Sequence, residues 1–435
     1  MSLKTVFKNA MAAAVILSAG SLSAQHLTRQ EKKIVKTISA NFKDQVRFTE
    51  EVVNINSGTM NHEGVRKVGQ VFGDAFKNIG FDTRWVNMPR EMDRAGHLFA
   101  ETSGKKGKKV LLIGHIDTVF EEDSPFQKME KVNDSISHGP GANDMKGGDA
   151  IILYALKALR ENGFLKDRQV IVALMGDEEF TGKPLSVSRK DLIEAAKRSD
   201  VALGFEPSGG FGEATMARRG SSGWKVEVTG KQAHSADIFS KEVGAGAIFE
   251  LSRIINAFYN EVRGDRYLTF NPGAILGGTE VSYDEARSKG EAFGKSNVVA
   301  RKAVVDGGLR FISEEQKEKA RVRMREIVSQ NLPQTSAGIT FIDSYPAMEP
   351  TEGNKALLEK LSKVSTDLGL GPVEAVDPLE KGAADVSFVA AYVDCLDSLG
   401  AMGEGAHSPQ ETINYNTLEA LTQRAALLIY RLLNE

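Results

Sequence analysis

Three short apolar runs, two of them separated by a helical segment, constrain the fold of this chain most. The runs are VLLIGHI (110–116), VIVALM (170–175) and VALGF (201–205), and each has the length and aliphatic content of a strand buried on both faces. Between the first two lies GGDAIILYALKALRENG (147–163), which is typical of a helix that ends near its last glycine. Strands that alternate with helices predict an α/β module with a mostly parallel sheet covered on both faces.

The middle of the chain has a different pattern. From about residue 216, apolar and polar residues alternate, which is typical of strands with one exposed face. The pattern predicts strands over 223–230, 297–311 and 337–348 and helices over 245–262 and 313–331. These segments form a two-layer α+β module inserted into the first one. We therefore expect an α/β module over 25–215 and 349–435, interrupted by an inserted module over 216–348.

The first 24 residues have the layout of a secretory signal peptide. Lys4 and Lys8 precede a short apolar stretch, and small residues follow up to Ala24, where we place the cleavage. An uncleaved membrane anchor is the alternative interpretation. We therefore expect the mature chain in the periplasm or outside the cell. Because Cys395 is the only cysteine, no intrachain disulfide can form, and the stability of the fold has to come from its core.

Length and charge limit the remaining possibilities. The chain has 435 residues, enough for two domains with a core each, and a formal net charge of −3. That near balance of charge does not favour a nucleic-acid partner, which usually requires a basic face. No apolar run after the leader approaches the ~20 residues that span a bilayer, so we expect no membrane association after leader cleavage.

Polar side chains with metal-binding chemistry follow the predicted buried strands. His115 and Asp117 end the first run, Glu178 and Glu179 follow the second, and Glu206 follows the third. In an open α/β sheet, ligand sites lie beyond the carboxyl ends of the strands, so these side chains are expected to meet there.

Asp144, just before the predicted helix, belongs to the same group. Several carboxylates in a site from which water is excluded repel one another strongly, and a pair of divalent cations would remove that cost. Imidazole together with carboxylates suits zinc. Among seven histidines, His407 is the best candidate for a further ligand, because it lies in a glycine-rich loop just before the last helix.

Five motifs, in this order and spacing, carry a resemblance to a known family: GHIDTVF, GANDMKGG, GDEEFTG, FEPSGG and AHSPQE. The chain resembles the dizinc exopeptidase and aminoacylase superfamily from about residue 45 to its C-terminus, and YPAMEPTEGN (345–354) fits as well. It looks closest to the glutamate carboxypeptidase branch. The resemblance implies a zinc-exopeptidase catalytic domain with an inserted ferredoxin-like lid and dimerisation domain. It also implies hydrolysis of the amide bond to a C-terminal amino acid.

The resemblance assigns five ligands to two Zn²⁺ ions, or to other divalent cations. His115 and Glu206 would bind one ion, Glu179 and His407 would bind the other, and Asp144 would bridge both.

Two further residues have implied roles beside the metals. Asp117 would orient His115, since a ligating imidazole needs an acceptor for its other nitrogen. Glu178 would be the general base that takes a proton from a zinc-bound water and delivers it to the leaving nitrogen. The resemblance also implies a cis peptide bond between Asp144 and Met145.

The inserted module is similar to the family's lid. His234 matches a lid histidine that reaches the partner's active site in dimeric relatives, so a homodimer through the lid is implied, although His234 acting in its own subunit stays open. Asn297 and Arg310 match residues that hold the substrate carboxylate, and Gly382 fits a loop that lines the substrate. Gly308 stands where relatives usually have an acidic residue, so the contacts that Arg310 makes are left open.

Three alternatives remain at this level. An aminoacylase or dipeptidase of the same superfamily would keep the chemistry and change the substrate, which is a small peptide or an N-acyl amino acid in each case. A metal-free binding or scaffold protein would have kept only the fold, and the intact set of ligands argues against it. A deacetylase of polymer ends would need an open cleft, whereas the lid favours small substrates.

Overall fold

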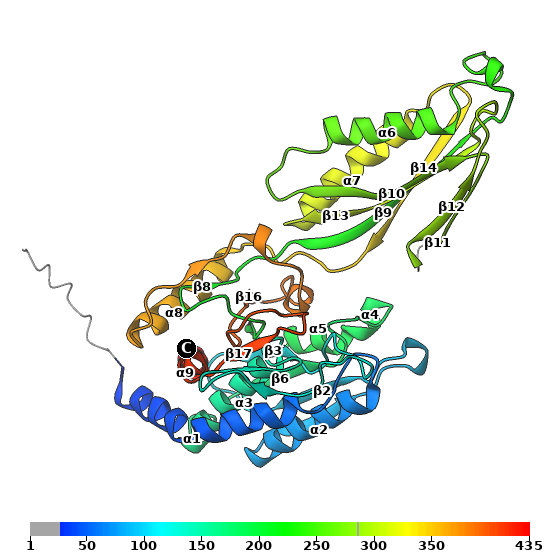
Figure 1. Cartoon of the computed structure of the whole chain (residues 1–435). Helices are drawn as coiled ribbons and strands as arrows, with labels where there is room; N and C mark the ends of the chain where they lie inside the picture. Colours follow the sequence, from blue (N-terminus) through cyan, green and yellow to red (C-terminus); the bar gives the residue numbers. More distant parts are fainter. Residues whose placement is uncertain (1–26, 285–286) are drawn as a thin grey trace, which may run out of the picture.

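The computed structural model describes residues 27–284 and 287–435, which form two modules joined by two crossing segments (Figure 1). The predicted leader lies outside the described residues. Within those two ranges, no helix combines the length and the apolar character that crossing a membrane requires.

A six-stranded sheet forms the centre of the first module, which we call the catalytic module after the role that its sequence predicts. Its order is β1-β2-β6-β3-β7-β16, and β6, β3, β7 and β16 run parallel, whereas β2 is antiparallel to both of its neighbours. The predicted α/β class with a mostly parallel sheet is therefore confirmed. The strands are β1 (Asp82–Val86), β2 (His97–Glu101), β3 (Val110–His115), β6 (Val170–Met175), β7 (Val201–Gly204) and β16 (Asp394–Leu396).

Helices cover both faces of this sheet. Leu112 of β3 and Val172 of β6 belong to one buried cluster with several long helices, whereas the next residues along each strand, Ile113 and Ala173, belong to a second cluster with α5. Burial of consecutive strand residues on opposite faces explains the continuous apolar runs of the sequence. The helices are α1 (Arg29–Val53), α2 (His62–Asn78), α3 (Lys146–Glu161), α4 (Leu185–Ser188), α5 (Lys190–Ala196), α8 (Glu352–Asp367) and α9 (Tyr415–Leu433).

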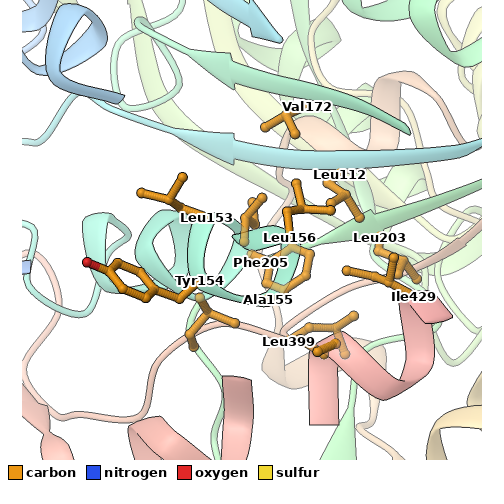
Figure 2. Close-up of a cluster of buried hydrophobic side chains, with 14 of the residues drawn as sticks. Leu112, Leu153, Tyr154, Ala155, Leu156, Val172, Leu203, Phe205, Leu399 and Ile429 are labelled. Atoms are coloured by element: carbon orange, nitrogen blue, oxygen red, sulfur yellow. The ribbon is translucent and has the colours of Figure 1, made fainter. Parts of the chain in front are cut away.

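Helix α3 packs closely against the sheet. Figure 2 shows Leu153 and Leu156 of α3 beside Leu112 of β3, Leu203 of β7 and Ile429 of α9. The helix approaches so closely that a Cβ at Gly148 would lie 2.3 Å from the carbonyl oxygen of Phe205. A glycine is required there, and the close approach fixes the start of α3 at the carboxyl edge of the sheet.

Short elements complete the catalytic module. One three-stranded sheet joins β17 to β5 and β4, and one pair joins β15 to β8. The elements are β4 (Glu130–Lys131), β5 (Ile136–His138), β8 (Glu213–Ala214), β15 (Glu374–Ala375) and β17 (Thr412–Asn414), with 3-10 turns η1 (Arg90–Met92), η4 (Pro378–Glu380) and η5 (Asp385–Phe388).

The inserted module, which we call the lid, is a four-stranded antiparallel sheet in the order β10-β13-β9-β14. Two helices cover one face of the sheet, around Trp224, Ile254 and Met324, so the ferredoxin-like α+β prediction is confirmed. The elements are β9 (Gly220–Gly230), η2 (Ser235–Asp237), α6 (Ala247–Glu261), β10 (Thr269–Gly278), β13 (Lys302–Phe311), α7 (Glu314–Ser329) and β14 (Thr335–Asp343).

Two details of the lid differ from the sequence-based expectation. The strand predicted over 297–311 begins only at Lys302, because the preceding segment pairs with the loop after β9 instead. A separate hairpin of β11 (Glu280–Asp284) and β12 (Lys289–Phe293), which was not predicted, lies beside the main sheet (Figure 1). Its residues are mostly exposed, so they lack the apolar alternation of a core strand.

The two crossing segments are tied to each other and to the catalytic module. Arg218 and Met348 pair as a β-bridge, with N···O distances of 2.9 and 3.0 Å. The Nε of Arg218 also donates to Oδ2 of the buried Asp397 at 2.7 Å. This buried pair fixes the point where the lid leaves the catalytic module.

Candidate metal centre

The polar residues of four loops converge at the carboxyl edge of the central sheet. His115 ends β3, Asp144 precedes α3, and Glu206 follows β7. The Nε2 of His115 lies 3.2 Å from Oδ1 of Asp144 and 3.8 Å from Oε1 of Glu206. One ligand atom from each residue fits within 4.8 Å of the other two, which is the spacing that one cation needs.

A second group of the same kind shares Asp144. The Nε2 of His407, from the loop before β17, lies 3.2 Å from Oδ2 of Asp144 and 3.1 Å from Oε2 of Glu179. Asp144 therefore turns one oxygen toward each group, which is the arrangement of a carboxylate shared between two cations. The cis peptide bond implied between Asp144 and Met145 is present.

The donor set fits a pair of divalent cations. Each group joins one imidazole to two carboxylates, which is a zinc-like set. The other oxygen of Glu179, Oε1, is buried and has no hydrogen-bond partner among the described residues. A buried carboxylate oxygen without a partner is costly, and a cation would satisfy it.

Burial shifts the acidity of the carboxylates in the centre. It raises the pKa of Glu206 to about 8, with a further contribution from the Asp144 carboxylate. Burial and the nearby Glu206 also raise the pKa of Glu178 well above its ordinary value. Neighbouring carboxylates that disfavour one another's ionisation indicate a site built for positive charge.

The pKa values of both imidazoles are raised, whereas burial alone lowers the pKa of a histidine. Hydrogen bonds to Asp144 and then Glu179 raise the pKa of His407 to about 11. Burial alone would lower the pKa of His115, but the hydrogen bonds to Asp117 and Asp144 outweigh it and raise that pKa well above the usual value. Both imidazoles therefore lie in a strongly negative environment.

Asp117 organises two parts of the centre at once. Its backbone oxygen lies 3.1 Å from Nδ1 of His115, and its Oδ1 lies 3.4 Å from the same nitrogen. Its two carboxylate oxygens also accept the backbone N–H groups of Glu178 and Glu179, each at 3.1 Å. The hydroxyl of Thr59 donates to Oδ2 at 2.7 Å. Asp117 thus positions the imidazole and the acidic loop together.

Glu411 is a positioning residue that the sequence analysis did not assign. It is fully buried, and its Oε1 accepts the backbone N–H groups of Asn143 (2.8 Å) and Asp144 (2.9 Å). Its Oε2 accepts the N–H of Gly141 at 3.2 Å. The residue lies four positions after His407, at the end of the AHSPQE motif, so that motif was the available signal. Glu411 therefore links the loop of His407 to the loop of the shared carboxylate.

A buried ion network supports the acidic loop from the other side. The Arg189 guanidinium bonds to Asp177, and its Nε donates to Oδ1 of Asp385 at 2.6 Å. Asp177 also accepts the N–H of Gly182 at 2.9 Å. Both ends of the loop that carries Glu178 are consequently anchored.

The predicted lid residues fall into two groups at opposite ends of β9. His234 forms a β-bridge with Val298, directly next to Asn297, in the region that follows the last residue of β9. Arg310 of β13 instead pairs with Ser221, at the start of β9. All three predicted lid residues, His234, Asn297 and Arg310, are exposed.

The length of β9 sets the distance between these two groups. Its 11 residues, at ~3.3 Å of rise each, extend roughly 33 Å away from the catalytic module (Figure 1). Gly382 lies near the other end, where its carbonyl oxygen accepts a hydrogen bond from Nη1 of Arg218 at 2.8 Å. We call the two crossing segments around Arg218 and Met348 the hinge. The structure places Gly382 and Arg310 near the hinge, and it places His234 and Asn297 at the opposite end of β9.

A mostly parallel α/β sheet with two linked cation sites at its carboxyl edge defines a dinuclear metallohydrolase. The comparison with family models makes the assignment specific. The chain belongs to the peptidase family M20/M25/M40, whose model matches residues 111–431. It is thus a hydrolase that acts on amide bonds and binds a dinuclear metal centre.

Named relatives span several substrates. The chain is 28% identical to Carboxypeptidase G2 from Pseudomonas sp. (strain RS-16), over 93% of this chain and 90% of the relative. It is 24% identical to a succinyl-diaminopimelate desuccinylase from Hydrogenovibrio crunogenus, over 87% of this chain and 96% of the relative. The resemblance to the exopeptidase superfamily is therefore confirmed, while these relatives differ in substrate.

Solved structures share the fold at lower identity. The aminopeptidase PepT from Bacillus cereus superposes with a TM-score of 0.70 at 17% identity, over 90% of this chain and 99% of the other. A Bacillus subtilis protein described as a dinuclear metal-binding peptidase of family M20 gives a TM-score of 0.61 at 16% identity, over 91% and 99%.

Proposed function

We propose that this chain is a dizinc exopeptidase that hydrolyses the amide bond to a C-terminal amino acid, with glutamate as the first candidate. The observation that carries the proposal is the Glu178 carboxyl, which lies beside two convergent ligand groups on a loop fixed by Asp117. The identity of 28% to a protein named a carboxypeptidase, over nearly the whole chain, supports the choice of substrate.

The reaction requires a water molecule to attack the scissile carbonyl. When bound, the two cations polarise that carbonyl and lower the pKa of the attacking water. Glu178 takes the proton from the water and delivers it to the leaving nitrogen, a contribution of typically 10²–10⁴-fold in rate. Burial and the nearby Glu206 carboxylate raise the pKa of Glu178, and a raised pKa makes this carboxylate a stronger proton acceptor. Asp117 keeps the Glu178 carboxyl in place because its Oδ1 accepts the backbone N–H of Glu178.

The proposal includes a carboxylate clamp on the lid. Arg310 is an exposed guanidinium on the hinge side of the lid, and it would bind the substrate carboxylate in a bidentate manner. Asn297 lies at the opposite end of the same lid, so it would complete the clamp of a second subunit rather than that of its own. Because β9 carries that end roughly 33 Å from the hinge, Asn297 and His234 would serve the metal centre of a second subunit.

A homodimer through the lid would bring those residues into reach. The outer side of α6 exposes Ile248 (48%), Phe249 (53%) and Tyr259 (55%), and the neighbouring β10 is an edge strand of the lid sheet. An apolar helix face beside an open sheet edge is a suitable self-association surface. We also propose that the chain is exported, on the basis of the leader-like residues 1–24.

A second candidate keeps the metals and changes the substrate. The named relatives include succinyl-diaminopimelate desuccinylases and an acetylornithine deacetylase, the latter 29% identical over 50% of this chain. These names favour an aminoacylase, and a dipeptidase is the further variant of the same chemistry.

A release assay decides between these candidates. Purified protein with added zinc is tested on N-acyl amino acids and dipeptides that vary separately in the acyl part and in the C-terminal residue. We expect amino-acid release that depends on the C-terminal residue, that stops on chelation and that returns with zinc. A preference set only by the N-acyl or N-terminal part would favour the aminoacylase or dipeptidase, and no release from any compound would contradict the proposal.

The role of Glu178 has its own test. Glu178→Gln should keep both metals, as measured by metal analysis, and should lower kcat at least ~10²–10⁴-fold because the proton acceptor is lost. Glu122→Gln, which alters an exposed carboxylate on the loop after β3, is the matched control. Parental turnover in Glu178→Gln would rule out the role of general base.

A further inference from the structure

Large apolar side chains are exposed on three loops around the metal centre. Phe180 is 61% exposed and follows the ligand Glu179, whereas Val119 is 38% exposed and lies two residues after Asp117. Met60 is 40% exposed and comes from a third loop. We call Met60, Val119 and Phe180 the apolar rim.

The apolar rim is held together by one nearly buried guanidinium. The Nε of Arg94 donates to the carbonyl oxygen of Phe180 at 2.6 Å, and the Arg94 guanidinium lies 4.3 Å from the centre of the Phe180 ring. Its Nη1 lies 3.3 Å from the sulfur of Met60. Arg94 is only 9% exposed, so it offers a fixed support rather than a mobile one.

Backbone contacts join the third member to the others. Gly58 and Thr118 form a β-bridge, and the N–H of Thr59 donates to the carbonyl oxygen of Thr118 at 3.2 Å. These contacts set the segment of Met60 beside that of Val119. The apolar rim is therefore built from three loops whose backbones are already fixed around the metal centre.

Packing of the protein does not explain the apolar rim. None of its three residues belongs to the three core clusters of the described residues. When a ligand covers an exposed apolar side chain, the removal of apolar surface from water stabilises the complex. Patches of such side chains therefore mark ligand-binding surfaces. The position next to Glu179 makes the substrate the expected ligand.

We propose that the apolar rim is a substrate subsite that binds an aromatic or large aliphatic acyl group. The inference rests on the proposed function, in which the lid clamps the carboxylate of the C-terminal amino acid. Because Arg310 lies on the lid and the apolar rim lies on the catalytic module, the acyl part of the substrate faces the apolar rim. The chain thus prefers substrates in which an apolar group precedes the scissile amide.

Binding without turnover provides the test. In the Glu178→Gln background with zinc present, calorimetry compares N-phenylacetylglutamate with N-acetylglutamate. The background should bind the phenylacetyl compound more tightly. Addition of Phe180→Ala should weaken the binding of the phenylacetyl compound about tenfold and the binding of the acetyl compound less than about twofold. This is the scale expected when apolar contacts in a pocket are lost. Met60→Ala should give a smaller loss with the same selectivity.

A control at the opposite edge of the sheet isolates the effect. Tyr392 is 49% exposed and precedes β16, so it lies at the amino end of the parallel strands, away from the metals. Tyr392→Ala should leave both affinities unchanged. Equal losses for the two ligands in Phe180→Ala, or no preference for the phenylacetyl compound in the background, would overturn the proposal.

A second ligand pair separates the two sides of the amide bond. N-acetylphenylalanine and N-acetylalanine differ only in the C-terminal residue, and Phe180→Ala should leave the ratio of their affinities unchanged. A selective loss for N-acetylphenylalanine would contradict the assignment to the acyl side. Failure of the parent enzyme to hydrolyse any of the four compounds would overturn the proposed function, whereas the apolar rim is judged by the binding ratios alone.

Discussion

The metal edge of the catalytic module and the functional face of the lid are built in opposite ways. At the metal edge, the side chains of His115, Asp144, Glu179 and Glu206 are at most 16% exposed, and each lies within 4 Å of a charged group of another candidate ligand. The fifth candidate ligand, His407, is 57% exposed. On the lid, the candidate residues are exposed and divided between the two ends of β9. The first region is therefore organised without a substrate, whereas the lid residues would have to be brought to the substrate if they act as proposed.

That difference separates the tasks of the two modules. A preorganised set of charged groups costs no rearrangement during the reaction, which favours chemistry at the metal edge. In the proposed function, the lid would contribute groups whose effect depends on lid movement or on a second subunit, which favours a role in substrate selection and closure. Variants at the metal edge should therefore damage the metal centre itself, and variants on the lid should leave it intact.

The largest expected effect comes from the shared carboxylate. Asp144→Ala removes a ligand from both groups, so both metals should be lost and kcat/KM should fall by about 10⁴-fold or more, the scale on which metal chemistry contributes. Metal analysis and amino-acid release measure the two effects. Asp134→Ala, on an exposed and distant turn, is the control. Retention of two metals in Asp144→Ala would show that the two groups are not linked.

The next effect tests whether the lid acts between subunits. The family resemblance implies that His234 stabilises the oxyanion formed during hydrolysis, so His234→Ala should keep both metals and lower kcat about 10²–10³-fold, as the loss of one oxyanion donor does. When this inactive variant is mixed and reassembled with Glu178→Gln, each mixed dimer regains one complete site. About a quarter of the parental activity should return if subunits pair at random. No recovery after verified exchange would place His234 in its own subunit.

A smaller effect concerns the loop support behind the metals. Glu411→Ala leaves three buried N–H groups without an acceptor, so zinc affinity should fall about 10–100-fold, which is typical for outer ligand partners. Competition with a chromogenic chelator measures this change. Glu404→Ala, an exposed position on the same loop, should have no effect. Unchanged zinc affinity in Glu411→Ala would contradict the positioning role.

The smallest expected effect concerns how the stability of the metal-free protein depends on pH. Glu206 has a pKa of about 8 in the metal-free fold and an ordinary value of 4.5 when unfolded, so the folded state holds the extra proton between these values. Stability without metal should therefore fall as pH rises from about 4.5 to 8, and the raised pKa values of His407 and Glu178 act in the same direction.

Zinc should reverse that trend. Because binding displaces the proton of Glu206, zinc affinity should increase up to about tenfold per pH unit below pH 8. Thermal melts with and without zinc should thus diverge as pH rises from 5.5 to 8. Melting curves whose zinc-induced shift is independent of pH would contradict the buried, protonated carboxyl.

Much of the metal edge was predictable because its candidate ligands lie in short sequence motifs at the ends of predicted strands. His115, Glu179 and Glu206 each follow a buried apolar strand, and parallel strands necessarily end at one edge of a sheet. The role of Glu411 was not predictable in the same way, because its partners are backbone N–H groups more than 260 positions away. Such groups have no sequence signal.

The lid shows most clearly which features of the fold the sequence could not predict. The alternating strands and the helices predicted its two layers, but β11 and β12 lack an apolar pattern and were missed. The separation of Arg310 from His234 follows from strand register, which long-range pairing sets.

The sequence by itself determined the α/β class, the inserted α+β module and the candidate metal-binding residues, because apolar periodicity and short motifs act over a few positions. Only the tertiary structure decided which oxygen of Asp144 faces which group, how Arg94 supports the apolar rim, and which lid residues lie near the hinge. These features depend on contacts between segments far apart in the chain. Their free energy comes from packing and hydrogen bonding that exist only once the whole fold has formed.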